Sequence, residues 1–186
     1  MHLEPGHIVE HRQLETIHGE VVSLPDPDRV IHLQFRRFAG CPLCCVHLRD
    51  VARRYDEIRS AGIVELAVFH SEVDAMQVHQ GDLPFAVVSD PARVLYDEFG
   101  LHTSARAVLD PRAWTGPLNP YAWQVGLRER AELNRLGRFG RGETWLMLPG
   151  DFLIAPDGRL LAAHYGVHAN DHWSVDELLG IGVEVA

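Results

Sequence analysis

The residues with the clearest potential for chemistry are three cysteines within five positions, Cys41, Cys44 and Cys45. Cys41 and Cys44 form a Cys-x-x-Cys pair that directly follows a predicted strand and begins a predicted helix. The first backbone N–H groups of a helix have no intrahelical partner and carry partial positive charge, which stabilises a thiolate. A thiol at such a place can have its pKa lowered from about 8.5 to roughly 3.5–7.5. The spacing therefore predicts an exposed, nucleophilic Cys41, with Cys44 one turn inside the helix and within bridging distance.

Residues next to the pair fit the same interpretation. Pro42 suits the first helical position, because that position needs no N–H partner. Arg36 and Arg37 come just before the cysteines. Successive side chains of a strand point to opposite faces, so we expect only one of these two arginines to reach the thiolate.

Two other interpretations of the cysteines stay open. Zinc would need a second ligand pair, and the sequence has no Cys-x-x-Cys or His-x-x-x-His partner with the spacing of a structural finger. His164, His168 and His172 are four residues apart, but Gly166 interrupts a helix there, so we expect surface or hydrogen-bonded histidines. Inert structural cysteines are the other alternative, and core packing is the role we expect for Cys45, with a backup thiol as its alternative. A Cys-x-x-Cys beside a βαβ pattern favours a redox dithiol.

A βαβ unit must position the dithiol. Residues 30–35 alternate apolar and polar types, which indicates a strand. Residues 42–62 repeat apolar types every three or four positions, which predicts an amphipathic helix of about five turns. Residues 63–69 are nearly all apolar, as in a central parallel strand covered on both faces. Further strands are expected at 21–24, 85–89, 151–155 and 159–164, with helices opening at Ser71, Asp90 and Ser174 and a helical stretch at 125–136. In this scheme Asp151 is a turn or cap residue rather than an acid–base catalyst.

Length and charge exclude several classes of protein. The 186 residues correspond to about one domain, predicted to span 1–186 with an extension at 1–29 and an insertion at 103–143. All 17 basic residues are arginine and 26 residues are acidic, so the net charge is −9. Nucleic-acid binding needs a basic face, and Schiff-base chemistry needs a lysine, so neither is expected. The apolar runs are shorter than a bilayer requires, and the start has no signal-peptide pattern, so we expect a cytoplasmic location away from membranes.

Five segments carry a resemblance to a known family: residues 22–25, 31–44, 48–50, 148–158 and 163–166. Their order and spacing resemble the thioredoxin fold, and specifically the peroxiredoxin-like branch of the AhpC/TSA superfamily. The resemblance implies an α/β fold with a central mixed sheet flanked by helices, interrupted here by a mainly helical insertion.

The resemblance also implies roles for individual residues. Cys41 falls at the peroxidatic position of peroxiredoxins, and Cys44 at the resolving position of thioredoxins. Pro149 resembles the cis-proline that faces the dithiol in thioredoxins. Peroxiredoxins place a Thr or Ser three residues before the peroxidatic cysteine, where this chain has Phe38. They also place an arginine at a strand position that corresponds to Pro149.

Arg36, Arg37 or Arg141 could take the place of that missing arginine. Trp114, Tyr121, Trp123 and Phe139, the aromatic residues of the insertion, are expected to bury it against the domain, with a dimer interface or a cover over the dithiol as alternatives.

The expected function is that of a thiol-dependent redox enzyme. The Cys41 thiolate attacks a disulfide or a peroxide, and Cys44 closes an intramolecular disulfide. The expected partners are a small-molecule peroxide or a protein disulfide, and an external thiol reductant such as a thioredoxin-like protein or a low-molecular-weight thiol. No metal or organic cofactor is expected, and a homodimer is possible. The alternatives are a true hydroperoxide reductase and a non-catalytic thioredoxin-fold binding or redox-sensing protein.

Overall fold

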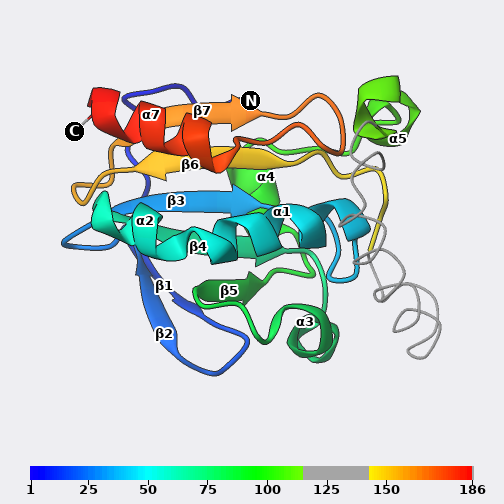
Figure 1. Ribbon diagram of the computed structural model, residues 1–186, viewed down its shortest axis with the longest axis horizontal. Helices are drawn as coiled ribbons and strands as arrows, with labels where there is room; N and C mark the ends of the chain where they lie inside the picture. Colours follow the sequence, from blue (N-terminus) through cyan, green and yellow to red (C-terminus); the bar gives the residue numbers. More distant parts are fainter. Residues whose placement is uncertain (115–142, 186) are drawn as a thin grey trace.

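A five-stranded mixed sheet forms the centre of the molecule (Figure 1). The computed structural model describes residues 1–114 and 143–185. The strand order is β5-β4-β3-β6-β7, with β3 parallel to β4, β4 parallel to β5, and β6 antiparallel to both β3 and β7. The strands are β3 (Val30–Phe35), β4 (Ile63–Phe69), β5 (Ala86–Ser89), β6 (Gly150–Ile154) and β7 (Leu160–Tyr165). The sheet thus contains the predicted βαβ unit and the predicted late hairpin.

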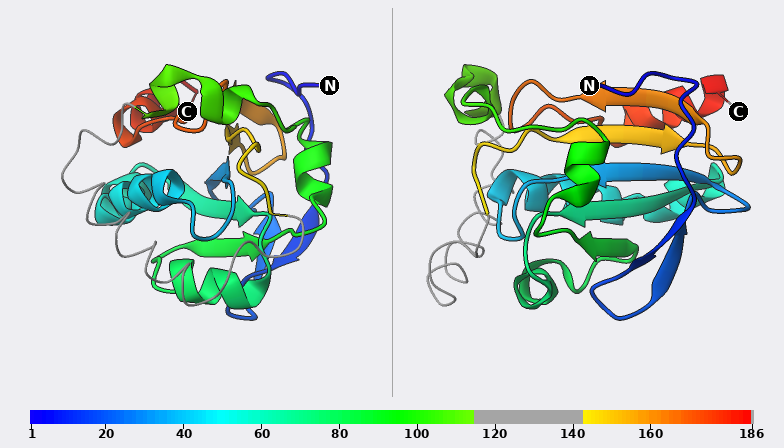
Figure 2. Two further views of the ribbon diagram at one scale, coloured as in Figure 1. Left: turned by 90° about the vertical axis from the view of Figure 1, so that its right-hand side faces the viewer. Right: turned by 180° about the vertical axis from the view of Figure 1, so that it is seen from behind.

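A separate two-stranded hairpin precedes the sheet. It joins β1 (Arg12–Glu15) to β2 (Val21–Leu24), of which only β2 was expected. Before it, the N-terminal segment runs along the turn between β6 and β7, where the amide of Val9 donates to the carbonyl of Gly158 at 2.8 Å. The view from behind in Figure 2 shows this segment crossing the back of the sheet.

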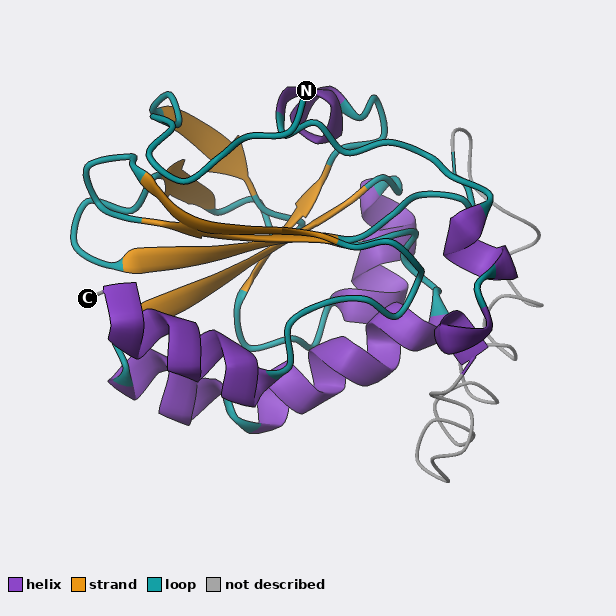
Figure 3. Cartoon of the chain, turned by 90° about the horizontal axis from the view of Figure 1, so that it is seen from above, coloured by secondary structure: helices purple, strands orange, loops and turns teal. Residues whose placement is uncertain are grey.

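Three helices cover one face of the sheet, as seen from above in Figure 3: α1 (Pro42–Arg53), α2 (Tyr55–Ser60) and α7 (Val175–Val185). The expectation of one helix of five turns is wrong, because the backbone leaves helical geometry at Arg54 (φ −108°, ψ 16°). The Arg54 side chain at this break bonds to Asp176 at 2.6 Å and to Glu57 at 2.8 Å. No helix of the described residues is long and apolar enough to cross a membrane.

The described residues also form shorter helices: α3 (Val73–Gln80), α4 (Val94–Glu98), α5 (Arg106–Leu109) and the 3-10 helix η1 (Pro111–Trp114). Ser71 does not cap α3, whose N-cap is Glu72. Asp90 does accept from the first amides of α4, at 3.0 Å from Val94 and 2.8 Å from Leu95. The predicted helical stretch at 125–136 lies outside the described residues.

Strand alternation divides the interior into two cores. Ile31, Leu33 and Phe35 of β3 point to the face that α4 covers, among apolar neighbours. His32 and Gln34 point to the opposite face, under α1, and both are buried. The face that carries the site is therefore polar at its centre.

Candidate active site

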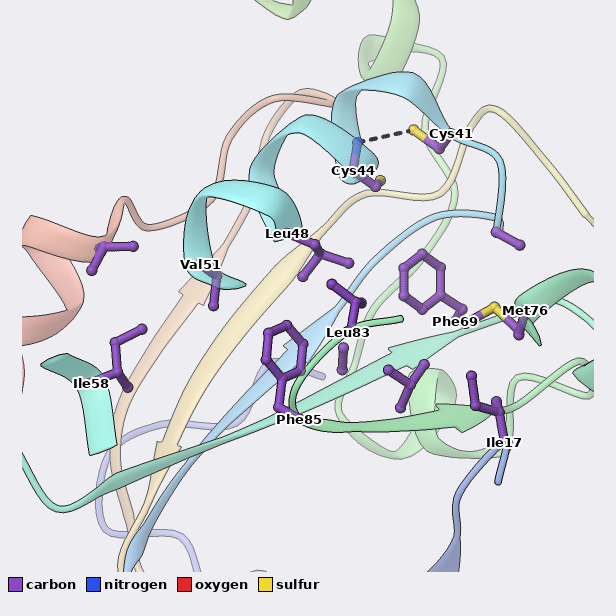
Figure 4. Close-up of a cluster of buried hydrophobic side chains, with 14 of the residues drawn as sticks. Ile17, Cys41, Cys44, Leu48, Val51, Ile58, Phe69, Met76, Leu83 and Phe85 are labelled. Carbon is purple, nitrogen blue, oxygen red and sulfur yellow. Dashed lines mark hydrogen bonds between the residues drawn. The ribbon is translucent and has the colours of Figure 1, made fainter. Parts of the chain in front are cut away.

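Cys41 is the N-cap of α1, as the sequence predicts. Its amide donates to the carbonyl of Phe38 at 3.0 Å, and its sulfur accepts from the amide of Cys44 at 3.5 Å (Figure 4). Pro42 occupies the first helical position. Both cysteines are free thiols. The pair thus stands where unpaired helix amides favour a thiolate.

The expectation that Cys41 is exposed is wrong. The exposed fraction is 0% for Cys41 and 3% for Cys44. The Cys41 sulfur turns back toward the first turn of α1, and the segment carrying Trp145 passes over the neighbouring Arg37. Only a small reactant, or a movement of the cover, would bring an electrophile to the sulfur.

Arg37 supplies the positive charge beside the thiol pair. Its Nη2 donates to the Cys41 sulfur at 2.8 Å, and its Nη1 donates to the Trp145 carbonyl at 3.2 Å. The guanidinium also lies 5.6 Å from the centre of the Trp145 ring. Arg36 lies under α1, where it bonds to Asp151 and His47, so of the two arginines only Arg37 donates to a cysteine sulfur, as predicted. Arg141, the third candidate, lies outside the described residues.

The two thiols titrate as an interacting pair. Burial opposes ionisation of Cys44, but the hydrogen bond with Cys41 and the charge of Arg37 lower the pKa of Cys44 to about 6. Burial, the same hydrogen bond and the nearby negative charge raise the pKa of Cys41 well above its ordinary value. Arg37 Nη2 and the Cys44 amide nevertheless both donate to the Cys41 sulfur. We therefore assign one negative charge at neutral pH to the pair as a whole, with the remaining proton between the two sulfurs.

The structure also places the two remaining predicted residues, Phe38 and Pro149. Phe38 is fully buried, with its ring centre 4.5 Å from that of Trp145, and it offers no hydroxyl. The cis isomer implied for Pro149 is wrong, because the Leu148–Pro149 bond is trans, the usual state of an X-Pro bond. The carbonyl of Pro149 instead accepts from the amide of Gly166 at 3.0 Å, beyond the end of β7.

Cys45 faces away from the pair, as expected. It is fully buried, its sulfur accepts from Gln80 Nε2 at 3.2 Å, and it lies 3.6 Å from the carbonyl of Ala39. These contacts fit the core-packing role.

A buried polar cluster lies under α1, in addition to the predicted site residues. His32 contacts Glu65 Oε2 through Nδ1 at 2.8 Å and Asp151 Oδ1 through Nε2 at 3.2 Å. Arg36 Nη2 donates to Asp151 Oδ1 at 2.5 Å and to Gln34 Oε1 at 2.7 Å. Asp151 lies inside β6 and has no exposed surface, so its interpretation as a turn or cap residue is wrong.

The charges of this cluster support one another. Burial opposes protonation of His32, but Glu65 and Asp151 raise its pKa to about 9. Burial likewise opposes ionisation of Asp151, but the charges of Arg36 and His32 keep its pKa well below the ordinary value. Two positive groups therefore face two carboxylates. A signal was present in the sequence, since polar residues recur at every second position through 32, 34 and 36.

The cluster reaches α1 through one histidine. Arg36 Nη2 lies 2.9 Å from Nε2 of His47, which is three residues after Cys44 on the same helix. Burial and the neighbouring His172 keep the pKa of His47 well below its usual value, so its ring is neutral. The rings of His47 and His172 are 3.7 Å apart at their centres. Of the other histidines, His164 bonds to a carboxylate, Asp171, at 3.1 Å, as expected for a hydrogen-bonded residue.

Comparisons with known proteins support the fold. A sequence model described as AhpC/TSA antioxidant enzyme matches residues 50–168, a range that starts after the dithiol. No curated protein matches the sequence. Among solved structures, the chain is similar to the peroxidoxin BcpB from Mycobacterium tuberculosis, with a TM-score of 0.68, 14% identity and coverage of 100% of this chain and 99% of that one.

Two further structures share the architecture. A mutant of the peroxiredoxin 6 of Arenicola marina has a TM-score of 0.66 and 13% identity, over 97% of this chain and 72% of that one. A putative thiol:disulfide interchange protein DsbE from Chlorobium tepidum has a TM-score of 0.58 and 19% identity, over 98% and 96%. The predicted thioredoxin-like α/β fold, with its central mixed sheet flanked by helices, is confirmed.

Proposed function

This chain belongs to the AhpC/TSA antioxidant enzyme family, and from that membership we propose that it is a two-cysteine thiol oxidoreductase that reduces a small hydroperoxide. One observation carries the proposal: Arg37 Nη2 donates to the Cys41 sulfur at 2.8 Å, with Cys44 one helical turn away. Arg37 thereby fills the role of the arginine that the family pattern requires beside its thiolate. A guanidinium stays charged at any physiological pH, so it favours the thiolate throughout.

The chemistry proceeds in three balanced steps. The Cys41 thiolate attacks the terminal oxygen of the hydroperoxide, the O–O bond breaks, and the sulfenic acid of Cys41 forms. The leaving alkoxide takes the proton of Cys44 and departs as the alcohol. The Cys44 thiolate then attacks the Cys41 sulfur, which forms the disulfide and releases hydroxide, and the hydroxide takes a proton from solvent. Two equivalents of an external thiol reduce the disulfide.

The burial of Cys41 favours a small electrophile over a protein disulfide. Attack on a disulfide sulfur requires the nucleophile to approach it directly, and Cys41 has no exposed surface. Thiol–disulfide exchange is the second candidate. It is favoured by the Cys-x-x-Cys spacing and by the likeness to a structure named as a thiol:disulfide interchange protein.

Stopped-flow fluorescence of the reduced protein mixed with hydrogen peroxide tests the proposal. Trp145 contacts Arg37 and lies beside the pair, so oxidation is expected to change its emission. We expect oxidation far faster than that of a free thiol, and its loss in Cys41→Ser. Cys44→Ser is expected to react once and to accumulate a sulfenic acid that dimedone labels.

Cys45→Ser is the matched control, since this third thiol lies on the same helix and outside the pair. A rate equal to that of free cysteine would overturn the peroxidase proposal. Cys41-dependent reduction of insulin disulfides would then support the second candidate. If Cys41→Ser changes neither the rate of peroxide oxidation nor the rate of insulin reduction, the protein is non-catalytic.

A further inference from the structure

A second polar residue lies beside Arg37 where the two central parallel strands end. Phe35 of β3 pairs with Val68 of β4, so two residues later Arg37 lies next to His70. The amide of His70 donates to the carbonyl of Arg37 at 3.4 Å, which holds the two backbones together. Neighbours in register point to the same face of a sheet. The side chains of Arg37 and His70 therefore emerge together at the edge where parallel α/β sheets commonly bind ligands.

Three polar atoms of these two residues have no hydrogen-bond partner in the described part of the chain. They are Arg37 Nε and both ring nitrogens of His70. His70 has an exposed fraction of 0%, so solvent does not replace the missing partners. Its ring packs edge-on against Tyr96, 5.7 Å away, but the Tyr96 hydroxyl already donates to the strand carbonyls of Arg36 and Val68. Buried polar groups are nearly always paired, so this group calls for an occupant.

The unpaired atom of Arg37 points to a place next to the reacting sulfur. Nε and Nη2 form one edge of the planar guanidinium, the edge whose parallel N–H bonds bind two acceptors side by side. Nη2 already donates to the Cys41 sulfur at 2.8 Å. An acceptor on Nε would therefore lie beside that sulfur.

The available donors and acceptors match a hydroperoxide. Burial and the charges of Arg93 and Arg37 lower the pKa of His70 to about 4, so its ring is neutral at physiological pH, with one N–H donor and one acceptor nitrogen. A hydroperoxide has two oxygens that accept and one O–H that donates. Arg37 Nε can donate to one oxygen, and one ring nitrogen of His70 can donate to the second oxygen or accept from the O–H; the two ring nitrogens point in divergent directions, so only one of them contacts a molecule this small.

We propose that Arg37 Nε and His70 form a hydroperoxide-binding subsite beside Cys41, in which His70 is a positioning residue that replaces the hydroxyl absent at Phe38. The inference rests on the proposed function. In the complex one guanidinium edge holds both reactants, the thiolate on Nη2 and the peroxide oxygen on Nε. His70 orients the O–O bond for attack.

The test compares His70→Phe, which keeps a ring against Tyr96 without nitrogens, with His70→Gln, which keeps a donor and an acceptor. We expect the second-order rate constant for hydrogen peroxide to fall about tenfold in His70→Phe, the factor that corresponds to 1.4 kcal/mol. We expect His70→Gln to recover most of that loss. The rate of alkylation of the pair by iodoacetamide is expected to stay at the wild-type value in both variants.

The other outcomes overturn either the subsite alone or both the subsite and the proposed function. A wild-type protein no faster than a free thiol would overturn both the function and the subsite. A fast wild type matched by His70→Phe would overturn the subsite alone, as would a parallel loss of peroxide and iodoacetamide reactivity. If His70→Phe fails to fold, a ¹⁵N spectrum of His70 in the Cys41→Ser/Cys44→Ser variant decides: hydrogen peroxide must shift the ring nitrogens, and an unchanged spectrum overturns the subsite.

Discussion

Arg36 and Arg37 are adjacent in sequence and almost fully buried, yet they serve two different clusters. Arg36 bonds to a carboxylate, an amide oxygen and a histidine, and its charge belongs to a set of two positive and two negative groups. Arg37 bonds to the Cys41 sulfur and a backbone carbonyl. Because successive side chains alternate between faces, Arg36 joins the buried polar cluster while the adjacent Arg37 joins the thiol pair.

The two clusters differ in whether the negative charge beside the arginine is permanent. The carboxylate of Asp151 is a fixed counter-charge, held inside β6. The thiolate beside Arg37 exists only while the pair is reduced, because a disulfide has no charge. The Arg36 cluster is therefore expected to govern stability and the Arg37 cluster to govern reactivity.

The largest effect is expected from Asp151→Asn, which removes the partner of two buried cations. Truncating one member of a buried ion pair costs about 3–5 kcal/mol, and we expect a loss of that size in the free energy of unfolding, measured by urea titration under reducing conditions. Asp82→Asn is the control, since the exposed Asp82 pairs with Arg49 at the surface and such pairs contribute only about 0–1 kcal/mol. Equal losses in the two variants would contradict the cluster as described.

The two clusters are next expected to give opposite pH dependences of stability. His32 has a folded pKa of about 9, above its unfolded value, so its contribution is complete below about pH 6.5 and disappears as the pH rises through 9. Cys44 has a folded pKa of about 6, below its unfolded value, so its contribution is complete above the unfolded pKa and is lost as the pH falls through 6. The change from His32 is on the order of 3 kcal/mol, and the change from Cys44 is partly offset by the raised pKa of Cys41.

Urea titrations between pH 6.5 and 9 separate these contributions. His32→Gln is expected to become more stable as the pH rises, because the thiol pair then dominates. The Cys41→Ser/Cys44→Ser variant is expected to become less stable over the same range, with the wild type between the two. If the free energy of unfolding changes with pH in the same way in all three proteins, the charges assigned to His32 and to the thiol pair are wrong.

A smaller effect, on rate rather than stability, is expected from Arg37→Met. Arg37 is one of the groups that lower the first pKa of the thiol pair to about 6; a return of that pKa to about 8.5 without the guanidinium lowers the thiolate fraction of the pair at pH 7 by at most about 30-fold. The rate of alkylation by iodoacetamide, followed from pH 5 to 10, reports both numbers. Arg49→Met is the control, since this arginine of α1 bonds to Asp82 and the His79 carbonyl rather than to a thiol. A wild-type pH profile in Arg37→Met would show that the helix terminus alone activates the pair.

The smallest effect is expected from Cys45→Ala. Its sulfur accepts from Gln80 inside the core and lies apart from both clusters. We expect a stability loss of about 1 kcal/mol, close to that of one hydrogen bond, and an unchanged rate of peroxide oxidation. A changed rate would give this third thiol a role in the chemistry.

Much of the architecture was predictable because its signals are local. The period change at Pro42 marks the start of α1, and the capping box of Ser174 and Glu177 marks the start of α7 with bonds of 3.3 and 2.8 Å. The break at Arg54 was not predictable, because the apolar period continues through it and the contact with Asp176 comes from the far end of the chain.

The position of the dithiol was predictable, but its surroundings were not. Trp145 lies about a hundred residues after Cys41, so the burial of the site depends on a tertiary contact that no local pattern shows. Asp151 follows Pro149 and a glycine, which suggests a turn, yet its partners lie across the sheet. His70 directly follows an apolar strand and belongs to no motif, and only its position beside Arg37 in the register singles it out.

In the proposed chemistry the reacting atom is the Cys41 sulfur, which is also the acceptor that caps the first turn of α1. A disulfide sulfur is a poorer acceptor than a thiolate, so oxidation weakens the end of the helix at the moment the chemistry is complete. Amide hydrogen exchange of Cys44 is accordingly expected to be faster in the oxidised protein than in the reduced one. The redox state of the two sulfurs is then expected to determine how much the first turn of α1 frays.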